Sequence, residues 1–363
     1  SRVSGSEIIS SNSKTSYNGN YGLNASWTIY NGSKRLKTLK QERLNNQVAE
    51  LDVATSENMI KESIAQIYIQ ILYAAESVRV NENTLQVSIA QRDRGQELLN
   101  AGSIAKSDFA QLEAQVSTDR YQLVTAQATL QDYKLQLKQL LELDGENEMN
   151  VYLPKLSDEN VLAPLPAKKD VYVSALAIRP EIEASKLNVE ASELGIDIAK
   201  SSYFPTISLS AGIGTNHTSG SDFTFGEQVK NGWNNSIGLS VSVPIFNNRQ
   251  TKSAVQKAKL QRETDMLSLL DEQKALYKTI ESLWLDANSA QQRYAAANEK
   301  LRSTQISYDL ISEQFNLGMK NTVELLTEKN NLLQAQQEQL QAKYMAILNT
   351  QLLKFYQGDK LTL

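Results

Sequence analysis

The chain has 363 residues and a formal net charge of −4; hydrophobic residues make up 41% of it and charged residues 21%. This charge offers no basic footprint for nucleic acid, and the absence of cysteine excludes disulfides, thiol nucleophiles and thiolate metal sites. No stretch approaches the roughly 18 consecutive apolar residues of a transmembrane helix.

Residues 1–20 are rich in Ser, Asn and Gly and predict a loop. Three later segments of about ten residues alternate between apolar and small polar side chains, which predicts β-strands. Their apolar positions are Tyr21, Leu23, Ala25, Trp27 and Ile29, then Ile207, Leu209, Ala211 and Ile213, and finally Ile237, Leu239, Val241, Val243 and Ile245.

The opposite face of these strands is almost wholly Ser, Gly, Asn and Thr, whereas solvated strands of soluble proteins usually carry Lys and Glu. The length suits a tilted transmembrane strand of about 9–11 residues. Aromatic residues (Tyr21, Tyr30, Trp233 and Phe246) lie at the strand ends, as at a membrane interface. A small soluble β-sandwich is the alternative. If the strands cross a membrane, several chains must share one barrel, because lipid does not tolerate an open sheet edge.

Two long helices are predicted over about residues 34–100 and 249–316. All six prolines lie between Pro154 and Pro244, and no glycine occurs from residue 246 to residue 317. The residues that end a helix are therefore missing from the second span, and its composition favours helix.

Gly102 and Gly318 then interrupt the chain, and returning helices are expected over about residues 104–142 and 320–357. Two antiparallel helical hairpins result. The first returning helix carries an apolar seam with 3-4 spacing, interrupted only by Asp119. Such a heptad seam predicts a left-handed coiled coil.

The two halves of the sequence repeat each other at an offset of 216 residues. Asn100-Ala-Gly102 corresponds to Asn316-Leu-Gly318, and Asp108 corresponds to Glu324. A period of this length predicts a duplicated structural unit of two large half-subunits rather than a solenoid. In this alignment the first half lacks the counterpart of an entry helix and a first strand, so we expect an amino-terminally trimmed chain.

The segment between the two halves differs from them in composition. Residues 143–169 hold three prolines and predict an irregular connection. Asp170 is expected to cap a short helix. Pro180 and Glu181 are typical of a first helical turn, and this second helix should end near Ser201.

These features, in this order, resemble the outer membrane efflux protein family, the TolC-like channels. The residues that carry the resemblance are Arg179-Pro180-Glu181, the segment 203–209 and the two turns, 102–108 and 318–324. The resemblance implies a homotrimer in the cell outer membrane that extends into the periplasm. It also implies the passive exit duct of a tripartite efflux pump or a type I secretion system, with a periplasmic adaptor protein and an inner-membrane pump as partners.

The expected fold is mainly α with a small β part: duplicated long antiparallel coiled-coil hairpins that form an α-barrel, plus transmembrane strands that enter a shared trimeric β-barrel. The expected segments are a barrel strand and extracellular loop (1–33), a first helical hairpin (34–142), an equatorial connection and helix (143–202), a barrel strand pair (203–247), a second hairpin (248–357) and an equatorial tail (358–363). Outer-membrane lipid is an expected partner, and nucleic acid is not.

The resemblance further implies a gate at the turns. In the family, an arginine two residues after the second-turn glycine bonds to a Thr-Asp pair of a neighbouring protomer. Lys320 takes the arginine position here, and Ser107 and Asp108 match the pair; lysine lacks the bidentate fork, so this latch should be weaker. Phe315 replaces a family tyrosine. Glu324 matches a ring of carboxylates that narrows the tunnel and would favour cations, although it could simply stabilise a helix start.

The residues of both turns would let a coiled-coil hairpin of the adaptor approach closely, because most of them are small. They are Ala101, Gly102, Ser103 and Gly318, with Met319 beside them. The alternative is that each glycine only permits a left-handed turn.

No catalytic or metal-binding constellation is found in the sequence. His217, the single histidine, lies in a polar segment that predicts a loop, and Asp271 and Glu272 are expected on a solvated helix face. We therefore expect no cofactor and no enzymatic activity. The alternatives to a duct are a structural coiled-coil envelope protein without a pore, such as a stalk or adhesin, and a soluble enzyme. Ten-residue strands with apolar faces of lipid length favour the duct.

Overall fold

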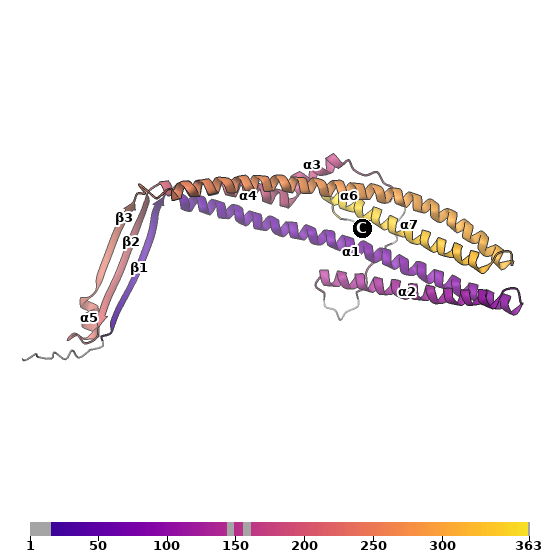
Figure 1. The fold of residues 1–363 in the computed structure, drawn as a ribbon. Coiled ribbons are helices and arrows are strands. Elements are labelled where there is room, and N and C mark those ends of the chain that lie inside the picture. The colour runs from indigo at the N-terminus through magenta and orange to yellow at the C-terminus, as the bar shows by residue number, and fades with distance from the viewer. Residues whose placement is uncertain (1–15, 144–148, 155–160, 362–363) are drawn as a thin grey trace, which may run out of the picture. The chain divides into compact units, whose positions relative to one another are not determined.

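The computed structural model describes residues 16–143, 149–154 and 161–361 (Figure 1). The chain forms two compact units, one made of residues 1–46 and 187–266 and the other of residues 47–186 and 267–363. The sheet belongs to the first unit, and the turns of both helical hairpins belong to the second. Among the described helices, none combines the length and the apolar character that a membrane span requires.

Three antiparallel strands form the sheet in the order β1 (Asn18–Asn31), β2 (Thr206–Thr218) and β3 (Asn234–Ser242). The three predicted strands are confirmed, with two corrections. β1 begins inside the segment that was expected to be a loop. β3 ends at Ser242 and does not reach Ile245, because Pro244 has no N–H to donate to a neighbouring strand.

A short helix that the alternation pattern did not reveal, α5 (Phe225–Asn231), lies between β2 and β3. It begins with a capping box: the Glu227 N–H donates to Thr224 Oγ1 over 3.4 Å, and the Thr224 N–H donates to the Glu227 carboxylate over 2.8 Å. His217 was expected in a loop but lies in β2, where its ring centroid is 5.0 Å from that of Phe225.

Four long helices form two hairpins, α1 (Lys34–Asn100) with α2 (Lys106–Leu140), and α6 (Gln250–Asn316) with α7 (Thr322–Gln357) (Figure 1). The helix bounds agree with the sequence prediction to within two residues. α1 and α6 each contain 67 residues, which corresponds to roughly 100 Å at about 1.5 Å per residue.

The chain leaves the sheet in the same way before α1 and before α6. Gly32 and Ser33 have φ angles of 65° and 62°, and Asn248 and Arg249 have φ angles of 50° and 63°. Two consecutive left-handed residues therefore turn the backbone sharply at each junction. Glycine is needed at the first junction for space as well, because a Cβ atom on Gly32 would lie 2.7 Å from the carbonyl oxygen of Ser201.

The connection between the halves contains α3 (Lys168–Ile178), α4 (Pro180–Lys200) and the 3₁₀ turn η2 (Ser201–Tyr203). Asp170 does not cap α3; Ala167 occupies the N-cap position, and Asp170 lies in the first turn. There its carboxylate still interacts favourably with the positive end of the helix dipole.

α7 packs against helices from both halves of the chain within the second unit. Its residues Tyr344, Leu348 and Leu352 contact Ile69 and Leu72 of α1, and further α7 residues pack against α3 and α6. Full burial of one such side chain stabilises a fold by about 1.5–3 kcal/mol. These contacts hold the two hairpins together.

Candidate functional site at the hairpin turns and on the sheet

Each hairpin reverses direction at a glycine with a left-handed backbone. Gly102 has a φ angle of 71° and Gly318 one of 74°. At the first turn the Gly102 N–H donates to the carbonyl of Leu99 over 2.9 Å, and the Ser103 N–H donates to the carbonyl of Leu98 over 2.8 Å. The second turn makes the same pair of bonds 216 residues later, with lengths of 2.9 and 2.8 Å. These bonds satisfy the last carbonyls of each helix and leave both glycines at the apex.

All five residues that were predicted to contact an adaptor are exposed, namely Ala101, Gly102, Ser103, Gly318 and Met319. The side chain of Met319 is 71% exposed. A Cβ atom built on Gly102 or Gly318 meets nothing within 4 Å, so the space next to both glycines is open. The glycines are therefore required by backbone conformation and not by crowding within the chain.

Asp108 caps the start of α2. Its carboxylate accepts a hydrogen bond of 3.3 Å from the backbone N–H of Ala105, which satisfies one of the N–H groups that have no partner in the helix. The neighbouring Ser107 is exposed. Both residues thus lie at the first turn, with Asp108 partly buried.

Glu324 occupies the matching position at the start of α7. Its amide donates to Asn321 Oδ1 over 2.9 Å, and its carboxylate accepts from the Asn321 N–H over 3.2 Å. Lys320 Nζ lies 2.5 Å from the same carboxylate, and the two side chains are 33% and 40% exposed. The hydrogen bond from Lys320 and the backbone N–H of Asn321 lower the pKa of Glu324.

Within the chain, then, Lys320 pairs with Glu324. The predicted latch would join Lys320 to Asp108 of another protomer, and it stays a prediction. An exposed pair such as Lys320–Glu324 is weak, because water screens the two charges and both side chains lose rotamer freedom. A second carboxylate could therefore compete for the same ammonium group at little cost.

Phe315 is not on the surface of the turn. Its side chain is 2% exposed and packs with Leu112 of α2 and Leu325 of α7. The ring therefore joins the two hairpins just behind their turns. Any effect of Phe315 on a gate would be transmitted through this packing.

Sequence reasoning missed a buried polar cluster further along the hairpins. Lys329 Nζ contacts both the Asp119 carboxylate and the Ser88 hydroxyl, so the cluster links α7, α2 and α1. The side chains of Lys329 and Asp119 are 4% and 1% exposed. Burial lowers the pKa of Lys329, against the opposing effect of Asp119. The one available signal was Asp119 itself, the polar residue in an apolar seam.

A second buried cluster explains the Arg179-Pro180-Glu181 motif. Arg179 Nε donates to Glu181 over 2.7 Å, and its terminal nitrogens lie 3.3 Å from one oxygen of Glu62 in α1. The guanidinium carbon also lies 4.2 Å from the ring centroid of Tyr356. Glu181 thus serves as an ion-pair partner, beyond its predicted effect on the helix dipole.

One face of the sheet is apolar over most of its length. At the end next to α5, Thr215, His217 and Asn235 share this face, and Phe225 packs against Tyr21 and His217. Paired rows such as Trp27–Leu209–Leu239 and Ala25–Ala211–Ile237 cross all three strands on this face. Several of its side chains are strongly exposed: Leu23 by 73%, Trp27 by 62%, Ile237 by 85% and Leu239 by 67%. A contiguous apolar surface of this kind marks a contact with lipid or protein.

The opposite face of the sheet is small and polar. It carries rows such as Ser26–Ser210–Gly238 and Thr28–Ser208–Ser240, and the Ser210 hydroxyl donates to the carbonyl of Gly238 over 3.2 Å. This alternation matches a membrane β-barrel, in which lipid-facing and lumen-facing residues alternate along each strand. Within the described ranges, no group of three or more His, Cys, Asp or Glu residues could hold a metal ion.

The fold thus combines a sheet that has one lipid-compatible face with two long helical hairpins in a single chain. The sequence profile of the outer membrane efflux proteins matches residues 1–142 and 171–358. The chain belongs to this family, and it is an outer membrane protein.

Individual relatives agree with this assignment. The chain is 25% identical to the outer membrane efflux protein BepC of Brucella suis over 80% of its own length and 61% of that protein. It is 24% identical to the outer membrane protein TolC of Escherichia coli K12 over 90% of its length and 66% of that protein. It therefore spans about three fifths to two thirds of these relatives.

Solved structures share the fold. The chain superposes on the CusC channel with a TM-score of 0.81 at 19% identity, covering 98% of this chain and 81% of that one. The outer membrane protein VceC of Vibrio cholerae gives a TM-score of 0.76 at 15% identity, with 96% and 88% covered.

Proposed function

We propose that this protein is the passive exit duct of a tripartite efflux pump or a type I secretion system, opened at the turns of its helical hairpins. The observation that carries the proposal is the exposed apolar face of the sheet, together with the small polar side chains on the opposite face. The relatives support it, because they include an outer membrane efflux protein, a cation efflux system protein and an alkaline protease secretion protein.

The sheet also supports a shared barrel. β1 and β3 are both edge strands among the described residues, and lipid leaves no water to satisfy the N–H and C=O groups of an open edge. Three strands of one chain cannot close a barrel. We therefore propose a homotrimer with a shared barrel, in which each chain supplies a duplicated pair of hairpins to the periplasmic tunnel.

The gate of this duct lies at the turns. Glu324 of three chains would form an acidic ring around the bore, and Lys320 would exchange between Glu324 of its own chain and Asp108, beside Ser107, of a neighbour. The exposed turn residues, Ala101 to Ser103 with Gly318 and Met319, would receive a hairpin of the periplasmic adaptor, while an inner-membrane pump supplies the driving energy. Phe315 would keep the two turns of one chain together during opening.

Single-channel conductance in a planar bilayer tests the proposal. We expect discrete steps with a preference for cations, and a reduced preference in Glu324→Gln. Glu113→Gln, which removes another exposed carboxylate near the first turn, is the control and should keep the preference. Folded protein that never inserts into a bilayer would reject the duct and favour the structural stalk or adhesin.

A further inference from the structure

We propose that a basic collar on this protein binds the phosphate headgroups of anionic phospholipids in the leaflet that faces the periplasm. The collar consists of six exposed cationic side chains at the starts of α1 and α6: Lys34, Arg35, Arg249, Lys252, Lys257 and Lys259. This inference rests on the proposed function, because it requires that the strands cross the outer membrane.

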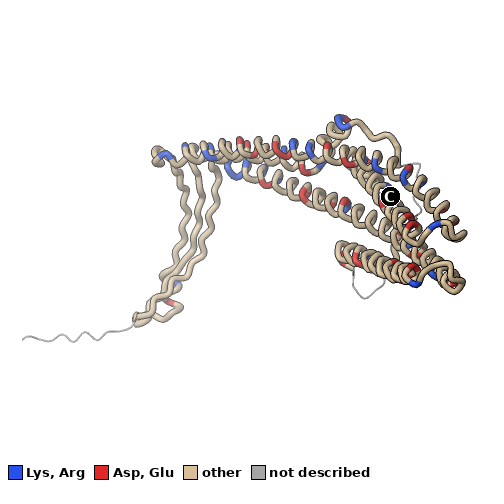
Figure 2. The backbone as a smooth tube through the Cα atoms, turned by 45° about the vertical axis from the view of Figure 1, so that its right-hand side comes forward, with Lys and Arg blue, Asp and Glu red and all other residues tan. Residues whose placement is uncertain are grey.

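The collar lies just beyond the end of the sheet at which β1 finishes. Asn31 at the end of β1 pairs with Thr206 at the start of β2, which in turn pairs with Ser242 at the end of β3. α1 begins at Lys34, and α6 begins directly after Arg249, so both helices start next to this end of the strands. Figure 2 shows basic residues gathered where these helices begin, next to strands that contain no Lys, Arg, Asp or Glu.

Charge in this region has one sign along each helix. In α1 no acidic residue precedes Glu42, although four basic residues do, and in α6 none precedes Glu263, although five basic residues lie from Arg249 to Arg262. Neither helix has an acidic residue in its first turn. Cations near a helix start are unfavourable with the helix dipole unless an anion compensates them.

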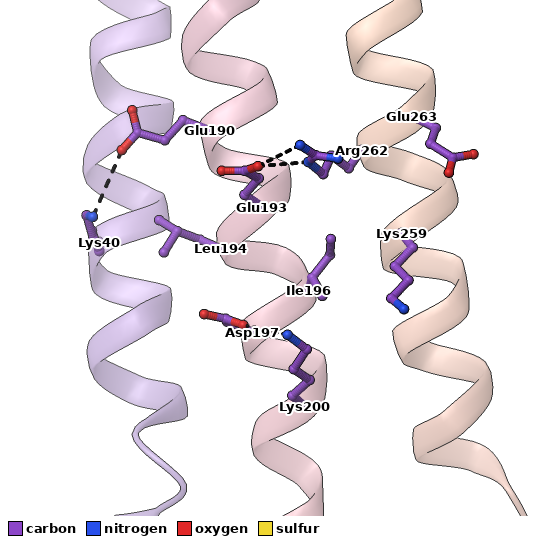
Figure 3. Close-up of a pocket in the computed structure, with 10 residues that line it drawn as sticks. All are labelled: Lys40, Glu190, Glu193, Leu194, Ile196, Asp197, Lys200, Lys259, Arg262 and Glu263. Atoms are coloured by element: carbon purple, nitrogen blue, oxygen red, sulfur yellow. Dashed lines mark hydrogen bonds and ion pairs between the residues drawn. The ribbon is translucent and has the colours of Figure 1, made fainter.

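α4 neutralises only part of this charge. Glu193 lies 2.8 Å from Arg262, and Glu190 lies 4.0 Å from Lys40 (Figure 3). None of the six collar cations has a carboxylate within 4.0 Å among the described residues. The charge that α4 leaves uncompensated is therefore concentrated toward the sheet.

Exposed aromatic side chains also lie close to the strand ends from which the collar begins. Tyr203, Phe204 and Phe246 are 54%, 50% and 83% exposed, and aromatic girdles of this kind mark the membrane interface of β-barrels. The collar continues the surface outward from that girdle, to the depth at which lipid phosphates lie. Long Lys and Arg side chains reach such a layer easily. Because the collar adjoins the apolar face of the sheet, a lipid headgroup fits it better than a free anion does.

Quenching of Trp27 by brominated lipids tests the collar. The full protein with Trp233→Phe and Trp284→Phe keeps Trp27 as its one tryptophan. After reconstitution at low salt, dibrominated phosphatidylglycerol should quench Trp27 fluorescence at lower mole fraction than dibrominated phosphatidylcholine. We define the preference as the ratio of the two lipid mole fractions that give equal quenching. Replacing Lys34, Arg35, Arg249 and Lys252 by Gln should reduce this ratio by at least about tenfold, because anionic lipid attracts each cation next to the membrane. The matched control replaces Arg120, Lys169, Lys278 and Arg293 by Gln; these exposed residues have no carboxylate within 4.0 Å in the described chain, and the preference should remain.

The outcomes separate the proposals. Retention of the preference in the collar variant, or its equal loss in the control, would refute the collar while leaving the duct intact. Loss of the preference when inorganic phosphate is added at constant ionic strength would assign the collar to a soluble anion. Loss of the oligomer in the variant would assign these side chains to contacts between copies. If the fourfold variant does not fold, two double variants repeat the comparison, namely Lys34→Gln/Arg35→Gln and Arg249→Gln/Lys252→Gln. Absence of Trp27 quenching by either lipid would refute strand insertion, on which both proposals depend.

Discussion

Lys329 and Asp119 form an ion pair whose two side chains are 4% and 1% exposed, with the Ser88 hydroxyl as a third member. The cluster joins three helices of the second unit and is buried between them. Removal of one charge from such a pair leaves the other buried without compensation, at a cost of about 3–5 kcal/mol.

We therefore expect Lys329→Met to lower the free energy of unfolding by roughly that amount. The double variant Lys329→Met/Asp119→Leu should regain most of the loss, because no charge is then left buried. Thermal and denaturant unfolding of the four members of this double-mutant cycle measure the coupling. Additive effects of the two substitutions would contradict the pairing.

The pKa of Glu324 predicts how acid affects the second turn. Because the hydrogen bonds from Lys320 and Asn321 lower this pKa below the ordinary value of 4.5, the ionised carboxylate stabilises the folded turn above pH 4.5. That contribution is lost as the pH falls through the folded pKa. The protection factors of the first-turn amides of α7, which correct for the intrinsic pH dependence of hydrogen exchange, should fall in this range. In Glu324→Gln they should be low throughout and vary little with pH.

Two glycines with left-handed backbones differ in what surrounds them. A Cβ atom on Gly102 meets nothing within 4 Å, whereas one on Gly32 would lie 2.7 Å from the Ser201 carbonyl oxygen. Gly102→Ala should cost only the conformational penalty of about 1–2 kcal/mol, and Gly32→Ala should cost clearly more. Thermal unfolding midpoints compare the two; equal losses would show that the junction relaxes around the new methyl group.

Arg179 holds two carboxylates at once, and it also contacts the Tyr356 ring. Burial raises the pKa of Glu62 despite this partner, so Arg179→Met would leave a half-buried acid without its cation. We expect a loss of about 3–5 kcal/mol for this variant. Arg179→Lys should restore only part of it, because lysine lacks the planar fork. Denaturant unfolding with Lys186→Met as a surface control measures the difference.

The secondary structure was largely predictable from sequence because the signals are local. Alternation places the strands, and the glycines at 102 and 318 place the turns. The end of β3 was missed because the apolar pattern continues through Val243 to Ile245, while pairing stops near Pro244. α5 was missed because a seven-residue helix has too few turns for a periodic pattern, although its capping box was readable.

The side-chain clusters were less predictable, because they join distant segments. Asp119 was visible as a polar residue in an apolar seam, but its partner Lys329 lies 210 residues away. Glu62 and Arg179 are separated by 117 residues. Phe315 was assigned to the gate because it takes the place of a tyrosine in the family. Only the packing of three helices shows that its ring lies in the interior.

The two turns have the same backbone conformation but carry different side chains. The same hydrogen bonds form at Gly102 and Gly318, yet serine follows the first glycine and methionine the second. In a ring of three such chains, a partner that recognises only the shape of the turn would find six equivalent places, whereas one that recognises side chains would find three. The number of partner molecules bound per ring would therefore show whether the partner recognises the shape of the turn or its side chains.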